Sequence, residues 1–524
     1  MKRTTLHHLA AAPLALVLAC VAGCADAQTS TVDLRVATTG GQVEGRAESD
    51  ARVFRGLPYA APPVGSLRWA PPQPAPRWNG LREARAFGPI CPQPKGGEGA
   101  KNQSGAAYSL FEGPMAEGAS EDCLTLNVWA PRAAAKAPVI MFIHAGVGAG
   151  SLPYYDGSAF ARDGVVMVTI NYRLVTLGNF AHRALTAEAG PYEPLGRFGM
   201  MDQIAALQWI KANIAAFGGD PDNVTIMGQS AGGAAVLQLL ATPSAKGLFH
   251  KAIVESGNGW WSPMNQAQDE AVGALLATRA GLPGAEATVE QLRALKVDAM
   301  PWFGAYSIDG RLQLENATDA FAAGRVPDVP LMIGWNSFDG SSLRYAPASV
   351  VATASPAVRA AYAGEKFSDE DLGYAMYTDS HVGAPARWIA ARSASGAPSY
   401  LYHFSYVLQR DRGKVRGAAH GRELPHAFDS WGKIPGAKFI LKDQDRAVTH
   451  VMHACWVAFA RTGVPACEGA PKWPRYDPKD DRLMEFGDTP QVRRHFRKDQ
   501  LDAQDADMAN VLAEQARSIE ELLR

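Results

Sequence analysis

Short apolar runs recur along the chain, and each is bounded by stretches of mixed polarity. Within a run the apolar residues stand at consecutive positions instead of alternating with polar ones. This pattern is typical of strands in a sheet that is covered on both faces. The runs predicted to be buried strands are 139–143, 165–170, 224–227, 252–255, 331–335 and 400–404.

Helical patterns separate or follow these runs. In residues 201–217 the apolar side chains recur at helical spacing, which predicts one long helix with a buried face. Residues 231–240 and 508–523 are predicted to form two further helices. Strands that alternate with helices favour an α/β fold, with a large, mostly parallel central sheet flanked by helices.

Two regions, about 263–326 and about 349–394, are richer in helix-forming residues and contain no clear strand. We expect them to be helical insertions above the sheet, where they would shape a substrate pocket. No linker rich in Pro, Ser or Gly interrupts the chain, so residues 28–524 are predicted to form a single domain.

The N-terminus has the pattern of an export signal: a basic start and then a short apolar stretch of small residues. Two cleavage positions fit. One gives a signal peptide of residues 1–27 and leaves Gln28 first. The other is a lipoprotein signal of residues 1–23, with Cys24 as the lipidated first residue. We therefore expect an exported protein that is periplasmic, secreted or lipid-anchored in the cell envelope, with no transmembrane span after the signal.

Composition excludes some partners. The 524 residues include 51 basic and 52 acidic side chains, for a formal net charge of −1. Such a balance gives no overall field that would attract nucleic acid or an anionic membrane. No spacing of His and Cys typical of a zinc site is present, so we expect no metal.

Residues 228–232 have the sequence Gly-Gln-Ser-Ala-Gly, which fits the G-x-S-x-G motif. The motif is informative only between a strand and a helix, and here it follows the predicted strand 224–227 and precedes the predicted helix 231–240. A sharp turn there strains the serine, and glycines on both sides let neighbouring chain pass closely. The helix N-terminus then directs N–H groups at a developing oxyanion. This context favours Ser230 as a nucleophile over an ordinary Gly/Ser turn.

A second segment also suits acyl transfer. The predicted strand 139–143 ends in the loop His-Ala-Gly-Val-Gly at 144–148. Such a loop supplies backbone N–H donors to an oxyanion hole, although the same residues also fit a flexible turn.

Longer segments resemble the type-B carboxylesterase/lipase family, which includes the cholinesterases. The most specific is Phe-Gly-Gly-Asp-Pro-Asp-Asn-Val-Thr-Ile-Met-Gly-Gln-Ser-Ala-Gly at 217–232, followed by Glu-Asp-Cys-Leu-Thr-Leu-Asn-Val-Trp-Ala-Pro at 121–131. Residues 54–60, 171–174 and 473–474 support the match, which covers nearly the whole mature chain. The resemblance implies an α/β-hydrolase fold with helical insertions over an active-site gorge.

The resemblance also implies a catalytic triad in the chain order serine, acid, histidine. Ser230 matches the nucleophile, Asp339 the acid and His420 the general base, while Ser256 resembles a serine that holds the acid. Family members more often carry Glu at the acid position. Because Asp is one methylene shorter, the loop of Asp339 must lie closer to His420.

The resemblance assigns the oxyanion donors to the backbone N–H groups of Gly146, Val147 and Ala231. This chain departs from the family at Ala145 and Val147, where successive glycines are usual. Both substitutions keep the N–H group, but a β-branched residue resists positive φ and narrows the pocket. Gly148 is therefore a shifted alternative donor.

Four cysteines lie outside the N-terminal segment: Cys91, Cys123, Cys455 and Cys467. They allow three pairings, of which the local one joins Cys91 to Cys123 and Cys455 to Cys467. The resemblance implies the Cys91–Cys123 bond, beside the gorge mouth, whereas the Cys455–Cys467 bond is inferred from proximity alone.

The predicted function is hydrolysis of small-molecule carboxylic esters through an acyl-serine, without a cofactor. The alternative from another class is a catalytically inactive, cholinesterase-like binding protein. Such relatives typically lack the serine or the histidine, and this chain has both. A closer alternative is the same machinery acting on lipids, carbamates or amides.

Overall fold

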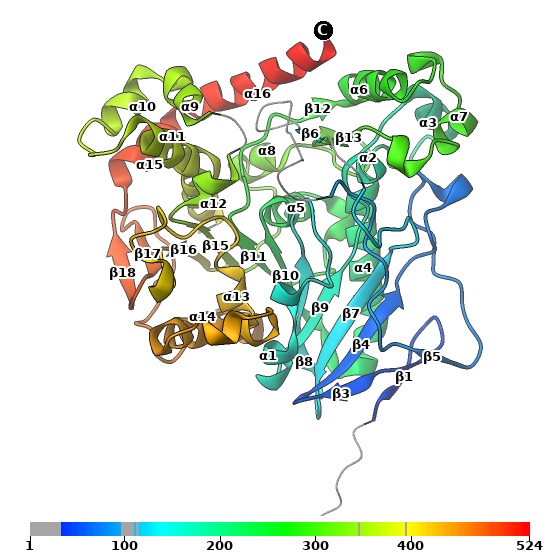
Figure 1. Cartoon of the computed structure of the whole chain (residues 1–524), viewed down its shortest axis with the longest axis horizontal. Helices are drawn as coiled ribbons and strands as arrows, with labels where there is room; N and C mark the ends of the chain where they lie inside the picture. Colours follow the sequence, from blue (N-terminus) through cyan, green and yellow to red (C-terminus); the bar gives the residue numbers. More distant parts are fainter. Residues whose placement is uncertain (1–32, 96–108, 112–114, 344–345, 394–395) are drawn as a thin grey trace, which may run out of the picture.

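The computed structural model describes residues 33–95, 109–111, 115–343, 346–393 and 396–524. Its largest feature is an 11-stranded sheet with helices on both sides (Figure 1). The predicted signal segment 1–27, with Cys24, lies outside the described residues.

The centre of this sheet is a block of parallel strands in the order β9-β8-β10-β11-β15-β16-β17. All the predicted strands are confirmed in this block, and β10 is longer than predicted. The strands are β8 (Ala137–Ile143), β9 (Val166–Ile170), β10 (Gly219–Gln229), β11 (Lys251–Glu255), β15 (Leu331–Asn336), β16 (Ser399–Phe404) and β17 (Arg482–Phe486).

Antiparallel strands extend both edges, with β7, β4 and β3 beyond β9 and β18 beyond β17. Among the described residues, three small sheets lie outside the main one. These edge and outlying strands are β1 (Arg35–Ala37), β2 (Gln42–Glu44), β3 (Arg46–Glu48), β4 (Ala51–Pro58), β5 (Leu81–Glu83), β6 (Ser109–Phe111), β7 (Thr125–Pro131), β12 (Met264–Asn265), β13 (Trp302–Gly304), β14 (Ser307–Ile308) and β18 (Pro490–Arg494).

Successive side chains of a strand point to opposite faces of the sheet, and a separate hydrophobic cluster covers each face. On β8, Val139, Met141 and Ile143 join a cluster that includes α4, α5 and α12. Ile140 and Phe142 join a second cluster with α1, α13 and α14. The helices are α1 (Ser158–Arg162), α4 (Phe198–Asn213), α5 (Ala231–Leu240), α12 (Ala384–Arg392), α13 (Leu424–Ala427) and α14 (Asp443–Thr462).

The predicted helices are confirmed as α4 with a following 3₁₀ turn, as α5 and as α16. The described part of 349–394 is helical as predicted. The expectation that 263–326 lacks strands was wrong, because β12, β13 and β14 lie there and are too short to leave a hydrophobic pattern. The remaining helices are α2 (Val175–Gly178), α3 (Arg183–Glu188), α6 (Gln266–Arg279), α7 (Val289–Arg293), α8 (Ala317–Ala322), α9 (Pro347–Thr353), α10 (Pro356–Ala361), α11 (Asp369–Thr378), α15 (Lys498–Ala506) and α16 (Met508–Leu523).

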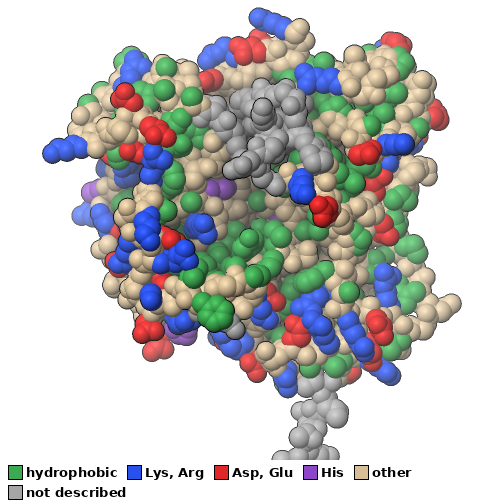
Figure 2. Space-filling view, in the orientation of Figure 1, with side chains coloured by type: hydrophobic (Ala, Val, Ile, Leu, Met, Phe, Trp, Pro, Cys, Tyr) green, Lys and Arg blue, Asp and Glu red, His purple; other side chains and the backbone are tan. Residues whose placement is uncertain are grey.

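Acidic and basic side chains are interspersed over the face of the molecule shown in Figure 2, which agrees with the nearly zero net charge. Both predicted disulfides, Cys91–Cys123 and Cys455–Cys467, are present. Within the described ranges, no helix has the length and apolar character needed to cross a bilayer.

Candidate active site

Ser230 occupies the sharp turn between β10 and α5. It is the N-cap residue of α5, and its φ of 57° and ψ of −123° lie outside the regions that L-residues normally adopt. A Cβ at Gly228 would overlap the carbonyl of Gly232, and a Cβ at Gly232 would overlap the carbonyl of Ile143. The close approach of the backbone therefore requires both glycines, and the turn holds Ser230 in a strained conformation.

Ser230 faces a cavity with a volume of about 440 Å³. Residues from several distant parts of the sequence meet around it. Those that the sequence singled out are Ser230, Asp339, His420, Gly146, Val147, Ala231 and Ser256.

His420 and Asp339 are in direct contact. Nδ1 of His420 lies 2.6 Å from Oδ1 of Asp339, which is short for an N–H···O hydrogen bond. The carboxylate is buried and follows β15, while the histidine precedes α13. A carboxylate at Nδ1 fixes the ring proton on that nitrogen and leaves the lone pair on Nε2.

Hydrogen bonds join the two loops that carry these side chains. The N–H of Phe338 donates to the carbonyl of Ala418 at 2.9 Å, and the N–H of Ala418 donates to Oγ of Ser337 at 2.9 Å. The N–H of His420 itself donates to Oγ of Ser341 at 2.8 Å. The loops are thus held side by side, which allows a carboxylate as short as Asp to reach the ring.

The second oxygen of Asp339 accepts two hydrogen bonds. Oγ of Ser256 donates at 2.9 Å and the N–H of Asn336 donates at 2.7 Å. Nδ2 of Asn336 also donates to the carbonyl of Ala419 at 2.9 Å and to Glu423. Asn336 therefore connects the acid loop to the histidine loop, a role that the sequence did not reveal.

Gln229 contacts the other nitrogen of the histidine ring. Its Nε2 lies 3.2 Å from Nε2 of His420, and an amide N–H donates only to a nitrogen that carries a lone pair. Both neighbours of the ring therefore favour the same tautomer, the one that a general base requires. Gln229 is the unspecified position of the G-x-S-x-G motif, so the motif does not predict this contact.

The loop after β8 packs against the start of α5. A Cβ built at Gly146 would lie 3.3 Å from that of Ala231. Among the described residues no acceptor receives the N–H of Gly146, Val147 or Ala231. Val147 does not have a positive φ, so its branched side chain introduces no strain. The N–H of Gly148 donates to Oε1 of Gln93 at 2.7 Å, so the shifted alternative donor is already engaged.

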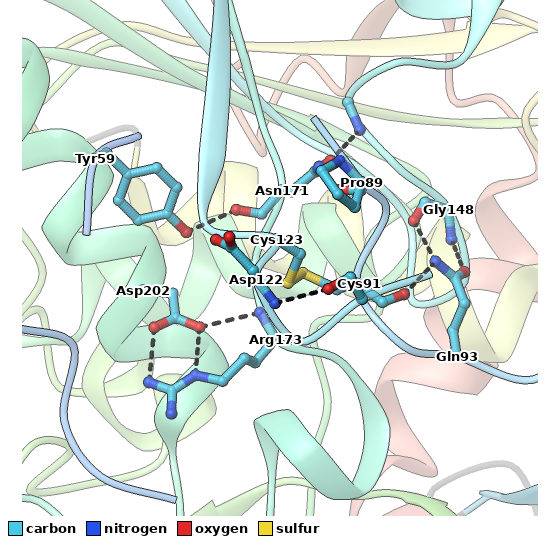
Figure 3. The surroundings of a disulfide bond; sticks show 12 residues. Tyr59, Pro89, Cys91, Gln93, Asp122, Cys123, Gly148, Asn171, Arg173 and Asp202 are labelled. Carbon is cyan, nitrogen blue, oxygen red and sulfur yellow. Dashed lines mark hydrogen bonds and ion pairs between the residues drawn. A yellow bond between two sulfur atoms is a disulfide. The ribbon is translucent and has the colours of Figure 1, made fainter. Parts of the chain in front are cut away.

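Gln93 clamps this loop from the side of the disulfide (Figure 3). In addition to accepting from the N–H of Gly148, it donates Nε2 to the carbonyl of Gly148 at 2.8 Å. Gln93 is two residues from Cys91, which is bonded to Cys123. The disulfide thus anchors the segment that holds the loop next to Ser230.

We expect replacement of both Cys91 and Cys123 with serine to lower the free energy of unfolding by about 3–4 kcal/mol, because the bond closes a long loop. We also expect kcat to fall several-fold, since Gln93 loses its anchor. Denaturant unfolding and hydrolysis of p-nitrophenyl acetate measure the two effects. The matched control replaces Cys455 and Cys467, neither of which lines the cavity, and should lose stability at unchanged kcat. An equal loss of kcat in both variants would contradict a role for the clamp.

Two buried glutamates accompany the Asp339–His420 pair. Burial raises the pKa of Glu423 to about 7, and the charge of Asp339 adds to the shift. Burial also raises the pKa of Glu255 well above its usual value, and the charge of Glu423 adds to this effect. Nε1 of Trp456 donates to Oε1 of Glu255 at 2.9 Å. A carboxyl that titrates near neutral pH therefore lies close to the histidine.

Glu423 makes the stability of the protein depend on pH. Its pKa is raised in the folded state, so the folded protein keeps a proton that the unfolded chain releases above about pH 4.5. Stability is therefore lost as pH rises from about 4.5 through about 7. Gln cannot release a proton, so Glu423→Gln should not lose this stability at high pH. We therefore expect the free energy of unfolding of Glu423→Gln to rise, relative to that of the wild type, between pH 5 and pH 8. Urea unfolding at both values measures this, and a difference independent of pH would contradict the assignment.

Two further histidines, His403 and His426, are buried and do not line the cavity. Burial lowers the pKa of both His403 and His426 to about 3, so they are neutral at physiological pH. In the described parts of the chain, no three His, Cys, Asp or Glu side chains are grouped so as to hold a metal ion.

Known proteins share this architecture. The model of the carboxylesterase family matches residues 32–352 and 351–504. The fumonisin B1 esterase of Sphingopyxis macrogoltabida is 34% identical over 500 residues, which are 88% of each chain. The para-nitrobenzyl esterase of Bacillus subtilis is 36% identical over 473 residues, which are 84% of this chain and 92% of that relative.

Solved structures agree with the sequence matches. A PNB esterase superposes with a TM-score of 0.75 at 30% identity, over 90% of this chain and 99% of its own. The Geobacillus stearothermophilus carboxylesterase EST55 at pH 6.2 gives a TM-score of 0.75 at 30% identity, over 90% and 100%. The chain therefore belongs to the carboxylesterase family, with the α/β-hydrolase fold and the class of activity, carboxylic ester hydrolysis, that define it.

Proposed function

We propose that the protein hydrolyses carboxylic esters through an acyl-serine intermediate. Oγ of Ser230 attacks the ester carbonyl carbon while Nε2 of His420 takes the hydroxyl proton. His420 then returns this proton to the departing alcohol, and a water activated by the same nitrogen releases the acid. Asp339 holds the Nδ1 proton and stabilises the imidazolium that forms.

One observation carries the proposal: the 2.6 Å contact between His420 and Asp339 at a cavity that Ser230 also lines. A His–Asp pair that only stabilises the fold would not need a strained serine at the same cavity. Likewise, an ordinary Gly/Ser turn would not require a histidine–aspartate pair beside it. The three side chains come from separate segments and line one cavity, which supports acyl transfer.

We also propose an oxyanion hole formed by the N–H groups of Gly146, Val147 and Ala231. Supporting this, these donors line the cavity and no described acceptor engages them. The tetrahedral intermediate would provide the missing acceptor. One such donor typically contributes about 10²–10³-fold to kcat.

Labelling with a fluorophosphonate probe tests the nucleophile. The phosphonyl group should bond to Oγ of Ser230, and mass spectrometry of the tryptic peptide should locate it there. Ser230→Ala and heat-denatured wild type serve as controls and should remain unlabelled, because the probe requires an activated hydroxyl. Folded wild-type protein that takes no label, or takes it on another residue, would overturn the mechanism.

We predict a preference for short acyl chains. A cavity of about 440 Å³ encloses a small ester but not a long acyl chain, and no large apolar lid is evident from the sequence. We expect kcat/KM for p-nitrophenyl butyrate to exceed that for the palmitate ester at least about tenfold, measured in one detergent. Higher activity on emulsified triglyceride would contradict this and indicate a lipase.

We further propose that the protein is exported. Two disulfides among the described residues support this, because such bonds persist in oxidising compartments. Mass spectrometry of the native protein should find either Gln28 or a lipidated Cys24 at the N-terminus. An unprocessed chain that begins with Met1 would overturn the proposal.

A further inference from the structure

A buried arginine lines the same cavity as Ser230. Arg197 is 3% exposed and precedes the first turn of α4. Its Nη1 donates to the carbonyl of Ser307 at 2.6 Å, and its Nη2 donates to the amide oxygen of Gln238. Its Nε has no hydrogen-bond partner among the described residues. The guanidinium is thus fixed in place with part of its donor capacity unused.

This guanidinium forms no ion pair with the part of the chain that the structure describes. Within the described ranges no carboxylate oxygen lies within 4.0 Å of its nitrogens. Asp269 and Asp309 act on it only at longer range. A hydrogen bond joins the carboxyl group of Asp269 to the side chain of Ser307. The oxygens of Asp309 accept backbone N–H groups from Leu195, Arg311, Leu312 and Gln313.

A buried cation without a close anion is costly, and proteins usually pair such charges. Burial lowers the pKa of Arg197, but an arginine pKa is high enough that the side chain stays protonated. The charge therefore remains, next to a cavity that a small molecule can enter. A bound anion would supply the partner that the protein itself does not.

Arg197 and Ser230 line the same cavity, and Tyr306 lies next to both segments. Cζ of Arg197 is 5.5 Å from the ring centroid of Tyr306, and the hydroxyl of Tyr306 is 3.5 Å from the carbonyl of Ala231. Because Ala231 follows Ser230, Tyr306 contacts both the guanidinium and the backbone next to the nucleophile. Gln203 also lines the cavity, and its buried Oε1 has no hydrogen-bond partner within the described ranges. One small molecule can therefore reach both the serine and this polar subsite.

We propose that the cavity selects esters that carry a carboxylate, and that Arg197 binds this carboxylate. The proposal rests on the esterase function above and narrows it to anionic substrates. Nη1 and Nη2 already donate within the protein, so the N–H of Nε is the group that would donate a charge-assisted hydrogen bond to a carboxylate oxygen. Bound ligand displaces water from the cavity, which strengthens the attraction. The carboxylate belongs to either the acyl group or the alcohol, and two substrate pairs distinguish these sources.

In the acyl pair, p-nitrophenyl hemiglutarate is compared with p-nitrophenyl glutaramate. In the alcohol pair, 4-acetoxybenzoate is compared with 4-acetoxybenzamide. Each pair differs only by a carboxylate in place of a carboxamide. We expect kcat/KM of the purified wild type to favour the carboxylate by about ten- to a hundredfold in one pair, after correction for spontaneous hydrolysis.

The outcomes separate the two proposals. Wild type that hydrolyses these esters without favouring the carboxylate in either pair overturns the anionic subsite and leaves the esterase function standing. Wild type that hydrolyses none of the four compounds overturns the esterase function.

Variants then assign the preference to one side chain. Arg197→Met should bring the ratio of the two kcat/KM values to about one or below, while Arg197→Lys should keep part of it, since lysine keeps the charge but not the directed N–H of Nε. Arg279→Met, which removes an exposed charge at the end of α6 outside the cavity, should keep the wild-type ratio. A wild-type ratio in Arg197→Met would overturn the assignment.

Inhibition of the wild type provides a test that does not depend on the folding of any variant. Glutarate and the neutral glutaramide are compared as competitive inhibitors of p-nitrophenyl acetate hydrolysis. We expect glutarate to bind at least about tenfold more tightly, because only the carboxylate can pair with the guanidinium. Equal inhibition by the two compounds would overturn the proposal.

Discussion

Ser230→Ala is expected to lower kcat for p-nitrophenyl acetate by about 10⁴- to 10⁶-fold. The substitution removes one atom, the oxygen that is proposed to bond to the acyl carbon. The cavity and the N–H donors of Gly146 and Ala231 remain, so KM should change little. Steady-state kinetics measures the effect, and titration with a fluorophosphonate corrects for traces of wild-type enzyme.

Ser230→Gly is the matched control for folding. It also lacks the hydroxyl and should be equally inactive, but it removes the Cβ that is strained at a φ of 57°. We therefore expect its free energy of unfolding to exceed that of Ser230→Ala by about 1 kcal/mol. Activity of Ser230→Ala within tenfold of the wild type would show that another residue is the nucleophile.

The centre of the fold could be predicted because its strands are covered on both faces. Val139 and Ile140 are neighbours in the sequence but are buried in the clusters on opposite faces of the sheet. Because both faces are buried, every position of such a strand is apolar, and the strand appears in the sequence as an uninterrupted apolar run. Every residue of β7 is buried as well, but β7 was not among the predicted strands. Its run is interrupted by polar residues, whose hydrogen-bonding groups are paired inside the protein. Asn127 in β7 donates to Thr169 at 3.0 Å and accepts from the N–H of Gly56. A sequence shows that such a residue is polar, but it does not show that the folded protein supplies a hydrogen-bond partner.

The candidate site follows a similar rule. Ser230 has a local signature, since a strand, a glycine turn and a helix are adjacent in the sequence. Asp339 and His420 have none, and only the family resemblance singled them out. Their alignment comes from hydrogen bonds between loops about 80 residues apart, such as that from Phe338 to Ala418. No spacing rule predicts these bonds.

Arg197 shows the same limit most clearly. Its segment has mixed polarity, and an arginine there is ordinarily exposed. Its burial arises because α5 supplies Gln238 and the short strand β14 supplies Ser307. The hydrophobic pattern of residues 263–326 predicts no strand, so it does not predict the contact with Ser307.

Asp339→Asn is expected to lower kcat by about 10⁴-fold, with little change in KM. The position of the two donors on Oδ2 explains why. Ser256 and the N–H of Asn336 both donate to this oxygen, so the oxygen of an introduced amide should occupy the same place. Its NH₂ group then faces Nδ1 of His420 and donates to it. The ring proton is forced onto Nε2, and the histidine can no longer accept the proton of the serine.

Asp339→Glu separates charge from position. It keeps the carboxylate and restores the residue more common in the family, but the loops here are fixed for the shorter side chain. Hydrogen bonds from Phe338 and from Asn336 hold the histidine loop, so the ring cannot retreat to admit another methylene. We expect a loss of about 10- to 100-fold in kcat, smaller than that of Asp339→Asn. Kinetics of both variants between pH 6 and 9 makes the comparison. If Asp339→Asn stays within tenfold of the wild type, a different carboxylate must orient the histidine, and the buried Glu423 is then the nearest candidate.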